Sequence, residues 1–202
     1  MEVWYIGGSP CSGKSTVAEQ LAARFGLTHY RVDDDLDALI DEGAAKGWPV
    51  CSRIRSLSPE ETWMRDPAEQ CREELAFYRE VSGLVRARLQ GLRAERVVAE
   101  GAAFLPELAR LWGVAPQRFV AIMPTREFQI SRYSRRPWVS QVLRDCSDPA
   151  AAFANWMERD ALFAEEVRRQ CVRPGYASLL TDGSVSGEEC LAQIAAHFGL
   201  TK

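Results

Sequence analysis

The stretch Gly8-Ser9-Pro10-Cys11-Ser12-Gly13-Lys14-Ser15 decides the fold of this chain of 202 residues. It ends Glu2–Gly8, a nearly continuous apolar run that predicts a strand buried on both faces. A helix is predicted directly after it, because apolar residues recur at helical spacing from Val17 to Phe25 and Gly26 is placed to end it. The glycine-rich stretch therefore joins a buried strand to a helix.

This stretch has the P-loop pattern Gly-x-x-x-x-Gly-Lys-Ser in the strand–helix context that the pattern requires. Backbone N–H groups of such a loop form an anion nest, and the helix behind it adds the positive end of its dipole. We expect Lys14 to bridge the β- and γ-phosphates, Ser15 to ligate Mg²⁺ and Thr16 to reach the α-phosphate. The residues predicted to bind ATP are Gly8, Ser9, Pro10, Cys11, Ser12, Gly13, Lys14, Ser15 and Thr16.

Composition argues against several other classes of protein. The 25 basic and 28 acidic residues leave a net charge of −3, without the basic excess that general nucleic-acid binding needs. No segment reaches 18 apolar residues and the N-terminal residues lack a basic region, so we expect a cytoplasmic protein without a membrane partner. The cysteines and the two histidines show no zinc-site spacing. The sequence leaves the oligomeric state open.

Strands and helices alternate along the rest of the chain, which predicts a parallel sheet with helices on both faces. Residues 48–57 are predicted to form a loop, and without a linker we expect a single domain over residues 1–202. Residues 34–95 are too long for a simple crossover, so we expect part of them to form a helical cap on the acceptor side. The further strands are predicted over residues 28–32, 96–99, 118–123 and 176–180. The later helices are predicted to begin near Ser58, Asp66, Thr125, Asp148 and Ser186.

This layout resembles that of the small P-loop kinases, which include nucleoside and nucleoside monophosphate kinases, shikimate and gluconate kinases, and chloramphenicol phosphotransferase. The resemblance rests on a strand, GSPCSGKS and a helix at the start of a chain with five predicted strands. It implies a P-loop NTPase fold of three α/β/α layers, with a five-stranded parallel sheet of order 2-3-1-4-5 and a mobile lid. It also implies ATP- and Mg²⁺-dependent phosphoryl transfer to a small acceptor.

Acidic residues follow the second predicted strand, with six acids between residues 33 and 42. Ligands gather at the carboxyl ends of parallel strands, and a carboxylate there can accept a proton from an attacking hydroxyl. By resemblance to sugar and shikimate kinases, Asp33 is the general base and a metal neighbour, and Asp35 binds the acceptor hydroxyl. The alternative is that these acids only cap the next helix.

Glu100 ends the third predicted strand and is followed by Gly101. This ending is similar to that of uridine-kinase-like enzymes and occupies the Walker B place. We expect Glu100 to hold Mg²⁺, directly or through water, together with Ser15 and Asp33, or to orient the acceptor. The alternative is a strand-end acid in solvent, and the sequence leaves open whether Asp33 or Glu100 is the base.

A lid is predicted over residues 126–147, which contain five arginines. Shikimate kinases have a similar run, so the resemblance places Arg132 near the adenine or the phosphates and makes Arg136 the lid arginine. The spacing here is shorter than in that family, so Arg135 is an alternative for the lid role. Guanidinium groups are suited to this role because they neutralise the charge spread over the γ-phosphoryl oxygens.

The acceptor itself is not readable from the sequence. Arg53 and Arg55 lie in the predicted cap, where they either bind an anionic acceptor or belong to the surface. The sequence predicts a phosphotransferase that moves the γ-phosphoryl of ATP to a hydroxyl of a metabolite or an antibiotic-like alcohol. Two alternatives stay open: a nucleoside or nucleoside monophosphate kinase, and a P-loop ATPase or switch without a small acceptor. The predicted catalytic residues are Lys14, Asp33, Arg132, Arg135 and Arg136.

Overall fold

The computed structural model describes residues 1–200, so the last two residues of the predicted domain lie outside the described part. Its five strands form one sheet of order β2-β3-β1-β4-β5, in which every neighbouring pair is parallel. This confirms the predicted sheet order.

The strands are β1 (Glu2–Gly8), β2 (Thr28–Arg31), β3 (Arg96–Glu100), β4 (Phe119–Pro124) and β5 (Ala177–Thr181). The α-helices are α1 (Lys14–Phe25), α2 (Leu36–Ala45), α3 (Pro49–Ser56), α4 (Pro59–Trp63), α5 (Pro67–Gln90), α6 (Pro106–Leu111), α7 (Arg126–Tyr133), α8 (Pro137–Leu143), α9 (Pro149–Val172) and α10 (Gly187–His197). Two 3-10 turns complete the chain, η1 (Val32–Asp35) and η2 (Pro116–Arg118).

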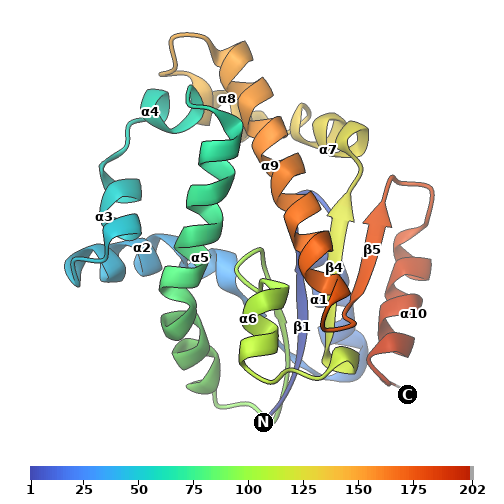
Figure 1. The fold of residues 1–202 in the computed structure, drawn as a ribbon. Coiled ribbons are helices and arrows are strands. Elements are labelled where there is room, and N and C mark those ends of the chain that lie inside the picture. The colour runs from blue at the N-terminus through green and yellow to red at the C-terminus, as the bar shows by residue number, and fades with distance from the viewer. Residues whose placement is uncertain (201–202) are drawn as a thin grey trace.

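Helices cover both faces of the sheet, as a buried parallel sheet requires (Figure 1). Helices α5, α6 and α9 pack on one face, whereas α1 and α10 pack on the other. Successive residues of a strand point to opposite faces. Val97 and Ala99 of β3 accordingly join the first core, whereas Val98 joins the second. This explains why the central strands β1, β3 and β4 are mostly apolar, and it confirms the three-layer α/β/α architecture.

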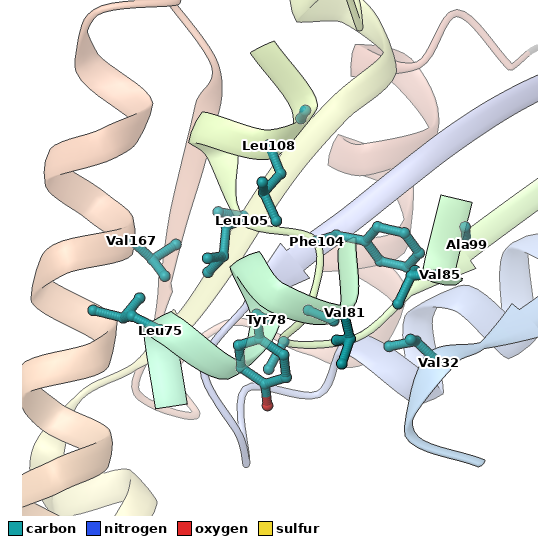
Figure 2. Close-up of a cluster of buried hydrophobic side chains, with 14 of the residues drawn as sticks. Val32, Leu75, Tyr78, Val81, Val85, Ala99, Phe104, Leu105, Leu108 and Val167 are labelled. Atoms are coloured by element: carbon teal, nitrogen blue, oxygen red, sulfur yellow. The ribbon is translucent and has the colours of Figure 1, made fainter. Parts of the chain in front are cut away.

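The larger core lies where α5 crosses the sheet and packs against α9 (Figure 2). Leu75 of α5 and Val167 of α9 face each other there, and Val81 and Val85 reach the sheet side of the same cluster. The hydroxyl of Tyr78 points away from the apolar cluster (Figure 2). Helix α5 therefore presents an apolar stripe to the core and leaves a polar group beside it.

Most helices begin where local capping signals predict. Ser58 and Ser186 each form a capping box with a glutamate three residues later. The side chains of Asp66, Thr125 and Asp148 accept hydrogen bonds from backbone N–H groups in the first turns of α5, α7 and α9. Among the helices described within residues 1–200, none has the length and apolarity of a bilayer span.

The prediction of a loop over residues 48–57 is wrong, because Pro49–Ser56 form helix α3. The free N–H groups at its start are satisfied from a distant element. The Glu80 carboxylate of α5 accepts hydrogen bonds from Val50 N at 3.1 Å and from Cys51 N at 2.7 Å. Cys51 of α3 packs closely on Gly43 of α2. A Cβ atom added to Gly43 would lie only 2.4 Å from the Cys51 sulfur. Helix α3 is thus stabilised by tertiary contacts.

The arginine-rich segment 126–147 contains two short helices, α7 and α8. A third apolar cluster joins this segment to α9 through Tyr133, Val139 and Leu143 on one side and Trp156 and Met157 on the other. The segment is therefore held against the long helix α9, beside the end of β4.

Candidate active site

The P-loop lies between β1 and α1, and its backbone has the turns that an anion nest requires. Gly8 has φ 115°, and a Cβ atom added there would lie 2.0 Å from the Ile122 carbonyl oxygen of β4. Gly13 caps α1 with φ 88°, and Cys11 has φ 60°. Cys11 is the one non-glycine residue with positive φ within residues 1–200. These left-handed conformations are uncommon outside glycine and typical of functional loops.

Polar groups of the loop are buried with few partners. Lys14 is only 6% exposed, and its Nζ donates a hydrogen bond to the Ser9 carbonyl oxygen at 2.8 Å. Burial lowers the pKa of Lys14, while the negative charges of Asp33 and Glu100 act in the opposite direction. The Ser12 hydroxyl is buried without a hydrogen-bond partner. An anion in the loop would satisfy these donors.

Glu100 is completely buried at the end of β3, which removes the alternative of a strand-end acid in solvent. Its two oxygens have no hydrogen-bond partner, and two basic side chains approach Oε1, His29 through Nε2 at 3.8 Å and Arg31 through Nε at 3.7 Å. Burial favours a higher pKa for Glu100, but His29, Lys14 and Ser15 together hold it below its ordinary value. A buried, charged carboxylate therefore lies beside the P-loop with free lone pairs.

Asp33 lies in η1, directly after β2, and approaches the end of β3. A Cβ atom at Gly101 would lie 3.1 Å from Asp33 Oδ1 and 2.1 Å from Val32 Cγ1, so only glycine permits this approach. Burial raises the pKa of Asp33, Lys14 lowers it and Glu100 raises it again. The structure thus brings Lys14, Asp33 and Glu100 together, as expected from the carboxyl ends of adjacent parallel strands.

Two cavities meet at the P-loop. One of about 660 Å³ extends from the start of α1 toward α7 and the turn after β5, and we call it the β5-side cavity. The other, of about 410 Å³, includes Lys14, Ser15 and Asp33, and we call it the Asp33 cavity. The residues that line both cavities are Cys11, Gly13, Thr16 and Arg136.

The three arginines predicted to contact phosphate all line these cavities. Arg132 and Arg135 line the β5-side cavity, and Arg136 lines both. The Arg132 guanidinium lies 4.7 Å from the centre of the Phe128 ring, and that of Arg136 lies 5.2 Å from the Tyr133 ring. Within residues 1–200 none of the three forms an ion pair with an acid. Their charges remain available to an anion.

The structure does not bring the other predicted acceptor ligands to the cavities. The Asp35 carboxylate accepts a hydrogen bond from the Tyr30 hydroxyl at 2.7 Å and lies 3.5 Å from Arg88. Arg53 pairs with Glu73 at 2.6 Å, and Arg55 pairs with Asp41. Neighbouring side chains therefore occupy all three groups.

Other polar residues at the site were missed by sequence reasoning. Glu74 and Tyr78 of α5 line the Asp33 cavity. Arg159 of α9 is held between Glu74 Oε2 at 2.7 Å and Asp160 Oδ1 at 2.6 Å. Burial raises the pKa of Asp160 to about 7, although the Arg159 guanidinium lowers it. No sequence signal marks these residues, because charges in long helices usually indicate a solvent-exposed face.

The groups present fit a magnesium nucleotide. No cluster of three or more histidine, cysteine or acidic side chains in residues 1–200 could hold a metal ion alone. Mg²⁺ in phosphoryl-transfer sites is bound through few protein ligands together with substrate phosphates and waters. The Ser15 hydroxyl and the unpartnered oxygens of Glu100 supply such ligands, and Asp33 lies beside them.

Comparisons with known proteins place the chain by fold. No protein-family model matches it, and no curated protein matches it in sequence. Among solved structures it is similar to a gluconokinase from Sinorhizobium meliloti 1021, with TM-score 0.50 and 16% identity over 98% of this chain and 91% of that chain. It is also similar to TT1252 from Thermus thermophilus, with TM-score 0.54 and 20% identity over 100% of this chain and 98% of that chain.

A shikimate kinase from Acinetobacter baumannii, solved in complex with shikimate, matches with TM-score 0.46 and 19% identity over 99% of this chain and 93% of that chain. The gluconokinase and TT1252 match better in structure, and sequence identities of 16% and 20% to them indicate a shared fold. Together with the sheet order and the P-loop at the end of the central strand, they lead to one conclusion. The chain has the fold of the small P-loop kinases.

Proposed function

We propose that the protein is an ATP- and Mg²⁺-dependent phosphotransferase that moves the γ-phosphoryl of ATP to a hydroxyl of a small molecule. One observation carries the proposal: the β5-side cavity and the Asp33 cavity meet at the P-loop, where they share Cys11, Gly13, Thr16 and Arg136. A nucleotide in the first cavity would direct its terminal phosphate into the second. An acceptor in the second would then meet that phosphate beside Asp33.

The transfer follows from the groups at this junction. The acceptor oxygen bonds to the γ-phosphorus, the bond from that phosphorus to the bridging oxygen breaks, and ADP leaves. Asp33 takes the hydroxyl proton, since it lines the cavity and its raised pKa makes it a stronger base than an ordinary aspartate. Lys14 and Arg136 stabilise the charge on the moving phosphoryl group.

Mg²⁺, when bound, neutralises phosphate charge and orients the phosphates for displacement. Ser15 and Glu100 would hold the ion, with Asp33 near it. Glu100 is suited to this role because it stays charged although it is completely buried. Arg132 and Arg135 line the nucleotide side, where they bind phosphate or orient the base.

Steady-state ADP formation with ATP, Mg²⁺ and a panel of sugars, polyols, nucleosides and aromatic alcohols tests the proposal. Acceptors that are substrates should stimulate turnover. Lys14→Ala should lower that stimulated rate by at least about 100-fold, because it removes a buried charge at the phosphates.

Lys46→Ala is the matched control, because this lysine pairs with Glu42 on the surface. It should keep the wild-type rate. A rate that no acceptor changes, or that survives Lys14→Ala, would contradict the proposal.

A further inference from the structure

Two aromatic side chains flank Arg136, the arginine that lines both the β5-side cavity and the Asp33 cavity. Its guanidinium carbon lies over the Tyr133 ring, 5.2 Å from the ring centre, and over the Trp138 ring, 5.6 Å from that centre. Both distances are within the range of a cation–π interaction, which extends to about 6 Å. Arg136 therefore has aromatic faces as its neighbours at the point where the two cavities meet.

The local backbone brings these three side chains together. Tyr133 ends α7, and the Arg136 N–H donates a hydrogen bond to the Tyr133 carbonyl oxygen at 2.9 Å. Arg136 is the N-cap residue of α8, and Pro137 at the first helical position fixes the direction in which that helix begins. Trp138 follows in the first turn of α8. A tight turn between two short helices thus places one ring before the arginine in the chain and one ring after it.

The two rings are held by α9. Tyr133 is only 3% exposed, and its ring centre lies 5.0 Å from that of Trp156. The Trp138 ring lies 5.9 Å from Trp156 and 6.1 Å from Tyr133, at 78° to the latter. Trp156 is in turn stacked on Trp63 of α4, with ring centres 4.3 Å apart. The rings beside Arg136 are therefore anchored to a long helix of the core.

The arginines of the segment 126–147 differ in the kind of partner they have. Arg126 pairs with Glu158, and Arg144 lies 3.5 Å from Asp145. Within residues 1–200, Arg136 forms no ion pair with an acid and has the two rings instead. An acid would neutralise the charge that a phosphate needs, whereas an aromatic face holds a guanidinium and leaves the N–H groups at its edge able to donate.

Such a contact matters because the Arg136 side chain is exposed. An exposed arginine samples many rotamers, and fixing it on a phosphate costs side-chain entropy. A guanidinium that already lies over two rings has lost part of this freedom before the nucleotide binds, which favours binding. Trp138 is 40% exposed and lines the Asp33 cavity, so its ring contributes to the site more than to the core.

We propose that Trp138 is a positioning residue, which holds the Arg136 guanidinium at the junction of the two cavities, where it binds the γ-phosphoryl group of ATP. This rests on the proposed function, because Arg136 takes its role from the transfer. Tyr133 forms the other side of the same contact but is buried, so Trp138 is the ring whose replacement leaves the core closed. The proposal makes Arg136, rather than Arg135, the lid arginine.

Nucleotide affinity separates an effect on the γ-phosphate from a general one. Dissociation constants of ADP and of the non-hydrolysable ATP analogue AMP-PNP, each with Mg²⁺, are measured by calorimetry on the full chain. Trp138→Leu should weaken AMP-PNP binding by about five- to tenfold, because it removes a cation–π contact. Its ADP affinity should stay within about twofold of wild type, which also shows that the variant is folded. Equal losses for the two nucleotides, or no loss for AMP-PNP, would overturn the proposal.

Trp138→Phe is the matched variant, because it is also apolar but keeps an aromatic face. It should bind AMP-PNP within about twofold of wild type. A loss as large as that of Trp138→Leu would mean that the size of the side chain matters and not its ring, and the positioning role would fail.

A double-mutant cycle tests whether Trp138 acts through Arg136. In an Arg136→Ala protein, Trp138→Leu should change AMP-PNP affinity by less than about twofold, since the contact is already absent. Arg135→Ala is the comparison background, because Arg135 lines the β5-side cavity and, within residues 1–200, lies over no aromatic ring. There Trp138→Leu should keep its full effect. The same effect of Trp138→Leu in both backgrounds, or its loss only with Arg135→Ala, would overturn the proposal.

These measurements need no acceptor, so they separate the two proposals. If Trp138→Leu selectively loses AMP-PNP affinity through Arg136 but no acceptor receives a phosphoryl group, the positioning role stands and the transfer function fails. If an acceptor is phosphorylated and Trp138→Leu raises only the KM for that acceptor, the transfer function stands. Trp138 is then a wall of the acceptor cavity, and the positioning role fails.

Discussion

Asp33 illustrates, at the scale of a single residue, how burial sets the pH at which the proposed base works. Burial and Glu100 raise the pKa of Asp33 more than Lys14 lowers it. A base must be unprotonated, so the transfer rate should fall as pH decreases through this raised pKa. The fall should occur at a higher pH than for an ordinary aspartate. A profile of kcat against pH measures it, and a rate that stays flat until the ordinary aspartate pKa would contradict the assignment.

Substitution at the same position separates binding from chemistry. Asp33→Asn should lower the transfer rate by about 10²–10⁴-fold, the usual contribution of a general base, and leave ATP affinity nearly unchanged. Asp34→Asn is the control, because the Asp34 side chain is 65% exposed and pairs only loosely with Arg31 at 3.8 Å. If Asp33→Asn transfers phosphate at the wild-type rate, Asp33 is not the base.

Gly8 and Gly83 differ in whether their positions tolerate a side chain. Gly8 has φ 115° and no room for a Cβ atom, whereas Gly83 lies in α5 with nothing within 4 Å of that position. Gly8→Ala should lower the free energy of unfolding by more than about 2 kcal/mol. Gly83→Ala should raise it by about 0.5–1 kcal/mol, because alanine loses less conformational entropy in a helix. Urea denaturation of both variants measures the difference, and equal effects would contradict the P-loop geometry.

At the scale of elements, α5 and α9 are joined by charge as well as by apolar packing. Arg159 of α9 lies between Glu74 of α5 and its own neighbour Asp160. Arg159→Leu would leave two acids without their cation and should destabilise the fold by about 3–5 kcal/mol. Arg169→Leu on the same helix is the control, because its side chain is 73% exposed, and its urea midpoint should stay close to wild type.

The pH dependence of Arg159→Leu has a definite sign. Burial raises the pKa of Asp160 to about 7 in the folded protein, and loss of Arg159 would raise it further. The unfolded chain releases this proton near the ordinary value of 3.8. Folding therefore takes up a proton between these values, and the free energy of unfolding falls as pH rises through that window. The deficit of Arg159→Leu should be larger at about pH 8 than at about pH 5. A larger deficit at the lower pH would contradict this account.

Local signals explain which elements could be predicted from the sequence. The starts of α4 and α10 follow from Ser58 and Ser186, whose partners are three residues away. Helix α3 was not predicted because the N–H groups of Val50 and Cys51 at its start are satisfied by Glu80, which lies 30 and 29 residues further along the chain. The burial of Arg159 was not predicted for a related reason. A charged side chain in a long helix is ordinarily exposed to solvent, and only the packing of α5 on α9 buries Arg159.

At the scale of the whole molecule, the sheet order explains why distant residues meet. Asp33 follows β2, Glu100 ends β3 and Lys14 follows the central strand β1, so all three gather at one edge of the sheet. The motif and the alternation of elements were sufficient to predict this gathering, with the order supplied by resemblance. The motif and the alternation of elements were not sufficient to predict the surroundings of Asp35 or Arg53. Arg88 of α5 lies beside Asp35, and Glu73 of α5 pairs with Arg53, and only the tertiary structure brings these side chains together.

Transfer of the γ-phosphoryl group is the central claim, and the fate of a radiolabel in that group tests it most directly. The protein is incubated with labelled ATP, Mg²⁺ and each of a panel of alcohols, and labelled products are separated from inorganic phosphate. The account predicts label on an organic acceptor, and loss of that product in Lys14→Ala and Asp33→Asn. Label found only in inorganic phosphate, whatever acceptor is present, would contradict it.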